Sequence, residues 1–149
     1  MYSKEESKKL RVEFWTTFGN LSKKKNKKAW ILYNTKIKDF NLKFTAEQKY
    51  CAVSIDIEHK NTSKRHSFFE NMSSLSMLFN EAFENRLVWE KDYYLDNGKV
   101  ISRIYIEKQD VSIYRKEDWP EMFEFLFTNM KILEGLFVEY KDIIKEFAE

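Results

Sequence analysis

Two stretches of alternating polar and apolar residues carry acidic side chains at positions suited to metal-dependent chemistry. Asp39 lies in the first stretch, residues 37–45, while Asp56 and Glu58 lie in the second, residues 51–58. Lys60 follows two residues later. Paired carboxylates offer the hard oxygen ligands that Mg²⁺ prefers, and a neighbouring lysine can activate water or stabilise charge on a phosphate. The pattern is compatible with metal-dependent hydrolysis of a phosphodiester.

This acid pattern resembles the active-site motif of restriction-endonuclease-type nucleases, which place an acid on one strand and Glu-x-Lys on the next within an α-β-β-β-α-β core. The resemblance implies a degenerate core of this kind, Mg²⁺ as the only cofactor, and these catalytic candidates: Asp39, Asp56, Glu58 and Lys60. Glu-x-Lys is a common triplet, and no proline precedes Asp39. The solvated polar face of a half-buried sheet, with no cofactor, is therefore the favoured alternative.

The two alternating stretches predict an antiparallel hairpin with its turn at residues 46–49. This turn places Thr45 opposite Tyr50 and, counting back, Asp39 opposite Asp56. Directly opposed like charges are unfavourable, so these two carboxylates require solvent, a basic neighbour or a metal ion.

The remaining reactive side chains form no recognisable constellation. His59 and His66 are the only histidines, and their seven-residue separation gives little support for a metal site. Cys51, the only cysteine, lies on the apolar side of its predicted strand and is expected to be a small core residue. A single cysteine excludes an internal disulfide and any multi-cysteine zinc site. No metal site is predicted.

The elements that would position these residues follow from periodicity and from capping and turn signals. The sequence predicts a helix from Ser3 that stops at Gly19-Asn20, and a second helix that begins at residues 61–63 and extends to Ala82. Asp118 is expected to cap a last helix. Strands are predicted at residues 30–33, 37–45, 51–58, 87–94 and 100–107, with a further short one at 111–114. The Asp96-Asn97-Gly98 turn predicts a type I′ hairpin.

The predicted order is α-β-β-β-α-β-β-(β)-α. It indicates a single α+β domain over residues 1–149, with helices packed on a mainly antiparallel sheet. The 149 residues fit one domain, and the three glycines and one proline exclude a Gly-rich phosphate loop or a linker-like chain. No signal sequence or membrane span is apparent, so a cytoplasmic protein without membrane contact is expected.

The last helix carries an apolar seam over about four heptads. Such a helix is roughly 45 Å long, against a domain diameter of about 40 Å. It is therefore expected either to break, at Thr128-Asn129 or Gly135, or to extend past the sheet. The favoured interpretation is burial against the sheet and the first helix; the alternative is a homodimer through Met130, Leu133, Phe137, Tyr140 and Ile144.

The net charge of +2 conceals an uneven distribution. Residues 1–65 contain 16 basic and 7 acidic residues, for a net charge of +9, whereas residues 66–149 carry −7. Unless the fold interleaves the two halves, the basic half offers a surface for nucleic acid or an acidic protein. The candidates for phosphate contact and base stacking, expected on a loop, are Lys23, Lys24, Lys25, Lys27, Lys28 and Trp30.

Several segments, in order along nearly the whole chain, resemble one bacterial family. They are Tyr2-Ser3-Lys4-Glu5-Glu6 leading to residues 13–19, the pattern W-x-x-Y-x-T-x-I over residues 30–37, Ile101-Ser102-Arg103-Ile104-Tyr105, and Lys116-Glu117-Asp118-Trp119-Pro120. The chain resembles the family called domain of unknown function 4268. The resemblance implies a stand-alone protein or a C-terminal module, and it brings no assigned activity or cofactor.

The resemblance also implies which residues would belong to a family site: Asp56, His59, Arg65, Glu70 and Arg103. Structural roles in ion pairs or caps are favoured for each of them. The leading functional hypothesis is a non-catalytic binding or assembly module that self-associates through its last helix. The alternative is the Mg-dependent phosphodiesterase, and the sequence leaves open whether any catalysis occurs.

Overall fold

The computed structural model describes residues 2–26, 30, 34–84 and 87–149. In order along the chain, its elements are α1 (Lys4–Asn26), β1 (Phe40–Ala46), β2 (Tyr50–Ile57), α2 (Thr62–Ser73), α3 (Ser76–Ala82), β3 (Val88–Tyr94), β4 (Val100–Gln109), the 3₁₀ turn η1 (Lys116–Asp118) and α4 (Trp119–Phe147). The α+β class, the antiparallel sheet and the long last helix are as the sequence predicts.

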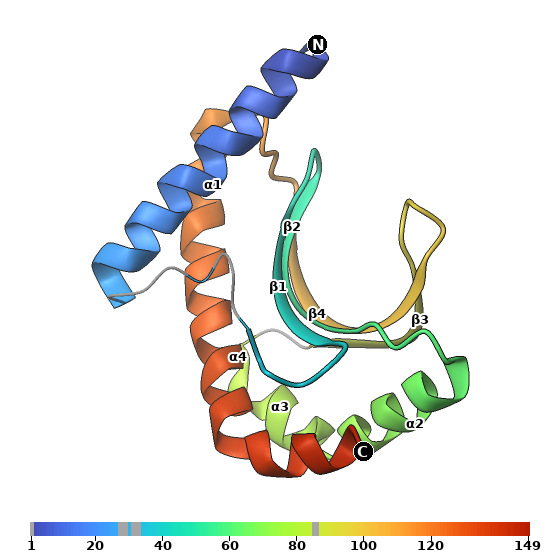
Figure 1. The fold of residues 1–149 in the computed structure, drawn as a ribbon. Helices are drawn as coiled ribbons and strands as arrows, with labels where there is room; N and C mark the ends of the chain where they lie inside the picture. Colours follow the sequence, from blue (N-terminus) through green and yellow to red (C-terminus); the bar gives the residue numbers. More distant parts are fainter. Residues whose placement is uncertain (1, 27–29, 31–33, 85–86) are drawn as a thin grey trace.

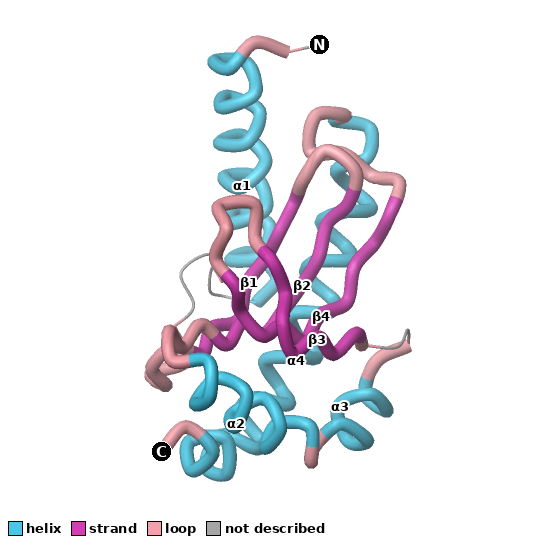
Figure 2. Tube along the Cα trace, turned by 90° about the vertical axis from the view of Figure 1, so that its right-hand side faces the viewer, coloured by secondary structure: helices cyan, strands magenta, loops and turns pink. Residues whose placement is uncertain are grey.

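The four strands form one antiparallel sheet in the order β1-β2-β4-β3. It is strongly curved, with α1 and the first half of α4 on its convex side and α2, α3 and the end of α4 beneath it (Figure 1). No described helix covers the concave side (Figures 1 and 2). The two chain ends lie at opposite ends of the molecule.

The first hairpin confirms the predicted faces but not the predicted register. Asn41, not Asp39, lies opposite Asp56, and Ala46 lies opposite Cys51. Three residues, 47–49, separate the two strands and form the turn. The observed register is therefore shifted by two residues from the predicted one. A shift of two keeps every side chain on its predicted face, because side chains alternate with a period of two. The predicted contact between two opposed carboxylates is therefore wrong.

The core fills the space between the convex sheet face and the helices. Phe14 and Phe18 of α1 contact Phe123 of α4, with ring centroids 4.8 and 5.8 Å apart. Phe14 also lies edge-on to Trp119, and Phe18 edge-on to Phe44 of β1. These aromatic contacts join α1, α4 and the sheet edge, which accounts for much of the aromatic content of the chain.

Helix α1 begins as predicted but continues past the predicted stop. Ser3 Oγ accepts a hydrogen bond from the Glu6 backbone N–H at 3.2 Å, as in a capping box. Gly19 does not end the helix: Gly19 and Ser22 are both buried, and packing there outweighs the helix propensity of about 1 kcal/mol lost at a glycine. Lys23, Lys24 and Lys25 consequently belong to the last helical turn rather than to a loop, next to the negative end of the helix dipole.

The predicted second helix is divided into α2 and α3. Asn61 caps α2, and its side chain accepts a hydrogen bond from Lys64 N. The division falls at residues 74–75, where Ser74 Oγ donates to the carbonyl oxygen of Asn71 at 2.7 Å. Such a bond competes with continuation of the helix. Met72, Leu75 and Phe79 are nevertheless buried as the predicted stripe requires.

Helix α4 is unbroken through both predicted weak points. Asn129 donates its side-chain amide to the carbonyl oxygen of Phe125, and Gly135 lies inside the helix. The 29 residues span roughly 44 Å, and the helix bends so that its final turns lie beneath α2 (Figure 1). The helix is longer than a compact domain is wide. It is accommodated because one part of it packs on the sheet and its final part packs on α2.

Three further local predictions are wrong. The β3–β4 turn is not type I′: Gly98 N–H donates to Leu95 O, and within the turn only Gly98 has positive φ, at 86°. Residues 111–114 form no strand, and residues 113–114 lie in a turn. Asp118 precedes α4 without capping it, because its carboxylate accepts from Ser112 N and Arg115 Nε. The strand predicted at residues 30–33 lies mostly outside the described residues.

The seam of α4 faces the interior of the protein itself. Met130, Leu133, Phe137 and Ile144 are buried, and Tyr140 is half-buried against Phe79. Burial against the sheet, the favoured interpretation from sequence, is what the structure has. Four of the five side chains expected at a dimer contact are therefore already buried within the chain, and the exposed apolar residues beside the seam are Val138 and Ile143.

Candidate functional site

The concave face of the sheet gathers polar side chains from all four strands. Strand register places Asn41 opposite Asp56, Asp56 opposite Arg103, and Arg103 opposite Glu90. We call these residues and their same-face neighbours the concave face: Asn41, Lys43, Tyr50, Ser54, Asp56, Glu58, Glu90, Tyr93, Arg103 and Tyr105. The opposite parity of β1, β2 and β4 carries apolar core residues, so the two sides of the sheet have different chemistry. In β3 the register is irregular between Glu90 and Tyr93, which allows both to lie on the concave face.

A buried ion pair lies at the centre of this face. Arg103 donates from Nε and Nη2 to the two carboxylate oxygens of Asp56, both at 2.8 Å, and Ser54 Oγ donates to Oδ1 at 2.9 Å. Asp56 is 1% exposed and Arg103 is 8% exposed. Burial lowers the pKa of Arg103, but the hydrogen bonds and charge of Asp56 raise it by more, so the net pKa is raised. Arg103 is therefore held in its charged form.

Tyrosines surround the guanidinium group of Arg103. The Cζ atom of Arg103 lies 4.3 Å from the ring centroid of Tyr93. The ring of Tyr93 is edge-on to that of Tyr105, with the two centroids 5.6 Å apart. Tyr105 donates its hydroxyl to Glu90 at 2.5 Å, and burial together with this bond raises its pKa. Burial, with Tyr93 and Glu47 nearby, raises the pKa of Tyr50 to about 12. The hydroxyls of Tyr50 and Tyr105 therefore act as neutral hydrogen-bonding groups, and the rings of all three tyrosines are rigid contact surfaces.

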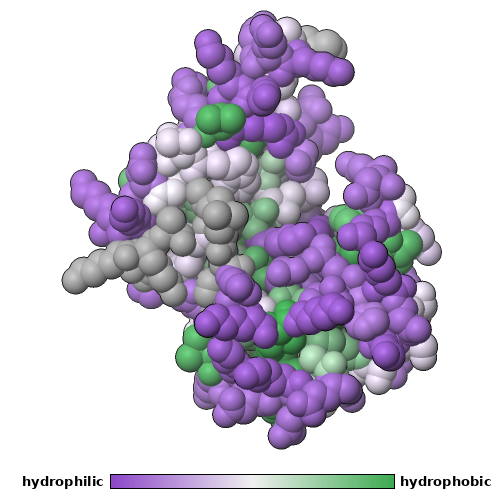
Figure 3. Space-filling model, in the orientation of Figure 1, coloured by the Kyte–Doolittle hydropathy of each residue, from purple (hydrophilic) through white to green (hydrophobic). Residues whose placement is uncertain are grey.

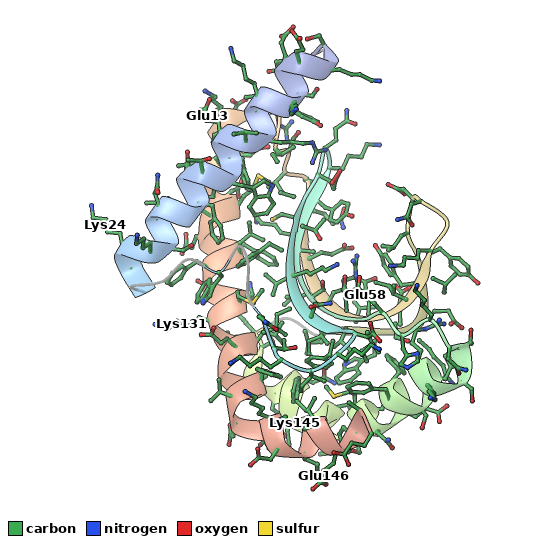
Figure 4. All side chains as sticks on the ribbon, viewed as in Figure 1. Glu13, Lys24, Glu58, Lys131, Lys145 and Glu146 are labelled. Carbon is green, nitrogen blue, oxygen red and sulfur yellow. The ribbon has the colours of Figure 1, made fainter. Side chains whose placement is uncertain are left out.

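A second polar group occupies the β1–β2 end of the concave face. Glu58 accepts from Asn41 Nδ2 at 2.6 Å and from Lys43 Nζ at 3.0 Å. Lys43 Nζ also lies 3.9 Å from Asp56 Oδ2, so this lysine links the two acids. Figure 4 shows Glu58 on the hollow side of the sheet, whereas Lys24 and Lys131 point away from it.

The four predicted catalytic candidates do not converge on one point. Asp56 and Glu58 share Lys43, but both oxygens of Asp56 are already bound by Arg103. Asp39, in the loop before β1, contributes its carbonyl oxygen to Glu58 N–H, and Lys60 is exposed beyond β2. No group of three or more histidine, cysteine, aspartate or glutamate side chains suited to a metal occurs among the described residues.

An open cleft of about 580 Å³ lies above the ion pair. It is lined by the β1–β2 turn, the β3–β4 hairpin and the face between them: Thr45, Glu47, Gln48, Lys49, Tyr50, Tyr93, Tyr94, Leu95, Asp96, Arg103 and Gln109. In the space-filling view the β3–β4 hairpin stands apart from the rest of the molecule, with mainly hydrophilic residues around the notch (Figure 3). Arg103 is thus held at the floor of a cleft with aromatic and amide walls.

Arg65 and Glu70 belong to a different cluster, on the convex side. Arg65 is 4% exposed and donates from Nε to Ser102 Oγ at 3.2 Å and from Nη2 to Asp92. His66 Nε2 lies 2.8 Å from the same carboxylate, and Lys91 pairs with Glu70 at 2.6 Å. The hydrogen bond with His66, aided by Arg65, lowers the pKa of Asp92. These contacts join α2 to β3 and β4.

Two other residues considered in the sequence analysis, His59 and Cys51, lie outside both clusters. His59 Nδ1 accepts from Asn61 N–H at 3.0 Å, next to the start of α2. Cys51 is fully buried, and desolvation raises the pKa of its thiol to about 12, as expected of an inert core residue. Of the family-site candidates, the structure therefore brings only Asp56 and Arg103 into direct contact on the concave face.

The proposed base-stacking residue is not accessible. Trp30 is 2% exposed and packs on Phe127, with ring centroids 4.9 Å apart, so it cannot stack on a base. Lys23, Lys24 and Lys25 are exposed at the end of α1, while Lys27 and Lys28 lie outside the described residues.

The sequence interpretation missed the tyrosines of the concave face. Tyr50 and Tyr93 lie on polar, half-exposed strand faces, and Tyr105 has the same parity as Arg103. The available sequence signal was the two-residue spacing of Arg103 and Tyr105 within residues 100–107, which places both side chains on the same face of the strand. The convergence of β3 with β2 around Arg103 depends on the strand order, which no local pattern specifies.

The fold and this face define an α+β protein in which helices bury one side of the sheet, while the other side is polar and, in the described part of the chain, is not covered by a helix. The family model described as "Domain of unknown function (DUF4268)" matches residues 10–141, so the chain belongs to that family, as its motifs suggest. No curated protein and no solved structure matches the chain. Among the described residues, no helix is both long and apolar enough to cross a membrane.

Proposed function

We propose that the protein is a non-catalytic binding module whose ligand site is the cleft on the concave face. One observation carries the proposal: a buried, bidentate Asp56–Arg103 pair is held at the floor of an open cleft that no described helix covers. Burying two charges gives little net stability, whereas removing one partner is costly. A buried pair in this position is explained if it holds the tyrosine walls and the Arg103 guanidinium in a binding-ready geometry.

The same contacts argue against catalysis at this face. A general base must be available to accept a proton, and Asp56 is occupied by Arg103 and Ser54. Ser54 Oγ donates to Asp56 rather than to a histidine, so it is not activated as a nucleophile. Side chains such as Asp56 and Ser54, which are held in place by hydrogen bonds they already make, are suited to ligand recognition.

A fragment screen by heteronuclear NMR tests the site. We expect bound fragments to shift the amide signals of Tyr50, Tyr93 and Arg103, and we expect the variant Tyr94→Ala to reduce these shifts. Tyr94 is 74% exposed and lines the cleft, so its loss should leave the fold intact. Met77→Ala, at an exposed position of α3, is the matched control. Fragments that shift only α1 and α4 signals would contradict the proposal.

Two partners expected from sequence have less support. Self-association through α4 has only Val138 and Ile143 as exposed apolar contacts, since the seam is buried. Nucleic-acid binding rests on Lys23, Lys24 and Lys25 without an accessible Trp30. Light scattering at high protein concentration tests the first, and the salt dependence of oligonucleotide binding tests the second, because phosphate contacts weaken steeply with salt.

A further inference from the structure

We infer that the ligand of the cleft is a segment of a partner polypeptide that inserts an aromatic side chain between the tyrosines. This inference rests on the proposed function and adds the chemical class of the ligand. Three properties of the cleft support it: its residue types, its balance of charge and its continuation beyond the concave face.

The residue types are those of protein-recognition surfaces. Three tyrosines, Tyr50, Tyr93 and Tyr94, line the cleft together with the amides of Gln48 and Gln109. Tyrosine and arginine are enriched at the energetic centres of protein interfaces, and tyrosine gives a large amphipathic contact at low entropy cost. Glutamine amides can both donate to and accept from a peptide backbone. An aromatic side chain of the ligand would stack on these rings in the same edge-on or tilted geometries that the core uses.

The charges of the cleft are balanced, which disfavours a phosphate polymer. Lys49 and Arg103 are the basic residues of the lining, and Glu47 and Asp96 are the acidic ones. Arg103 is neutralised by Asp56, and Glu47 is paired with Arg11 at 3.2 Å. Binding of nucleic acid draws its affinity from several uncompensated basic residues that displace counterions. A chain of neutral peptide groups can bind without uncompensated basic residues.

The cleft adjoins a second hollow, so an elongated ligand fits better than a compact one. This second hollow, of about 850 Å³, lies beside the start of α1 and shares Gln48, Lys49 and Gln109 with the cleft. It adds Tyr2 and Tyr114, and its basic Arg115 is paired with Asp118 at 2.8 Å. The same mixture of tyrosine, amide and compensated charge thus continues across the β1–β2 turn. A polypeptide presents repeating amide groups along such a path.

Selection from a display library of random short peptides on the full-length protein tests this inference. We expect the enriched peptides to share an aromatic residue, and their affinity by fluorescence anisotropy to fall at least about tenfold in Tyr93→Ala. Because Tyr93 also packs on Arg103, Tyr94→Ala provides a second variant with no such packing role, and it should weaken binding in the same direction. Met77→Ala should bind as the unaltered protein does.

Nucleotides, single-stranded oligonucleotides and oligosaccharides form the comparison panel. If one of these binds in a Tyr94-dependent manner while no peptide is enriched, the polypeptide inference is overturned and the binding-module proposal stands. If peptides bind but Tyr93→Ala and Tyr94→Ala leave their affinity unchanged, the inference is likewise overturned for this cleft. If no probe of any class or NMR fragment engages the cleft, both fail.

Discussion

At the scale of single residues, the Asp56–Arg103 pair organises the concave face. Asp56 accepts three hydrogen bonds, two from Arg103 and one from Ser54, and Arg103 in turn lies over Tyr93. Each of these groups supplies hydrogen-bond partners to the next, so the side chains of Asp56, Ser54 and Arg103 have no buried polar atom without a partner. This arrangement makes the pair sensitive to the loss of one member.

Asp56→Asn is expected to lower the free energy of unfolding by about 3–5 kcal/mol, because it leaves the Arg103 charge buried without its counter-charge. Chemical denaturation followed by circular dichroism measures the change. Glu70→Gln, which removes an exposed ion pair with Lys91, serves as the control and should have little effect. Equal losses in the two variants would show that the buried pair has no special role.

The raised pKa of Tyr50 predicts a loss of stability at alkaline pH. Its folded pKa of about 12 exceeds the ordinary value of 10, so the folded state retains a proton that the unfolded state releases. The contribution is fully present below pH 10 and is lost as pH rises towards 12. Denaturation at several alkaline pH values should show a shallower decline in Tyr50→Phe than in the unaltered protein. Parallel declines would refute the assignment.

At the scale of elements, two glycines with open surroundings have opposite backbone requirements. Gly135 lies in the interior of α4, and an added Cβ would meet no atom within 4 Å. Gly98 has equally open surroundings but a φ of +86°, which an L side chain rarely adopts. The space around a glycine therefore does not decide the outcome of a substitution at these positions; the backbone conformation does.

Gly135→Ala should raise the free energy of unfolding by roughly 0.5–1 kcal/mol, because alanine favours the helical backbone. Gly98→Ala should lower it by about 1–2 kcal/mol, since the turn requires a left-handed residue. Thermal unfolding of both variants measures the two effects. Destabilisation by Gly135→Ala would indicate that α4 needs a break at this point, contrary to its continuous form.

Element prediction from sequence succeeded where burial alone sets the pattern. Phe40 and Leu42 on β1, and Val53 and Ile55 on β2, alternate because one side of the sheet is apolar. It failed at Gly19, where packing overrides a helix-stop signal, and at Ser74, where a side chain competes for the helix carbonyl. Both failures depend on local contacts that a periodic pattern does not contain.

At the scale of the whole molecule, α4 is shared by every layer. Its first half packs on α1 and the sheet, and its second half reaches α2 and α3 (Figure 1). Phe137 is 1% exposed and stacks on Phe40 of β1 at 5.7 Å. A single helix that supports all layers should make the protein unfold as one cooperative unit.

Phe137→Ala is expected to lower the free energy of unfolding by about 3–5 kcal/mol through lost burial and a residual cavity. Tryptophan fluorescence and far-UV circular dichroism should still report the same transition midpoint in this variant. Val138→Ala, at the adjacent but 64% exposed position, should change stability by less than about 0.5 kcal/mol. Separate midpoints for the two probes would contradict the single cooperative unit.

The whole fold also changes the meaning of the uneven charge. β2 from the basic half pairs with β4 from the acidic half, and α1 packs against α4. Lys116 pairs with Glu13 at 2.7 Å and Arg65 pairs with Asp92, both across the division of the sequence. The fold therefore interleaves the two halves, and ion pairs such as these join acidic and basic residues across the division.

The sequence alone determined the fold class, the faces of the strands, the start of α1 and the apolar seam of a long last helix, because these depend on hydrophobic periodicity and local caps. Whether that helix is continuous was decided by the tertiary structure. It also singled out Asp56 and Arg103 as separate candidates. Only the tertiary structure decided that these two residues meet, that Asp39 does not oppose Asp56, and that tyrosines of β2 and β3 line the same cleft. Strand order and register join residues 47 positions apart, and those long-range pairings arise from the packing of the whole sheet rather than from any segment of it.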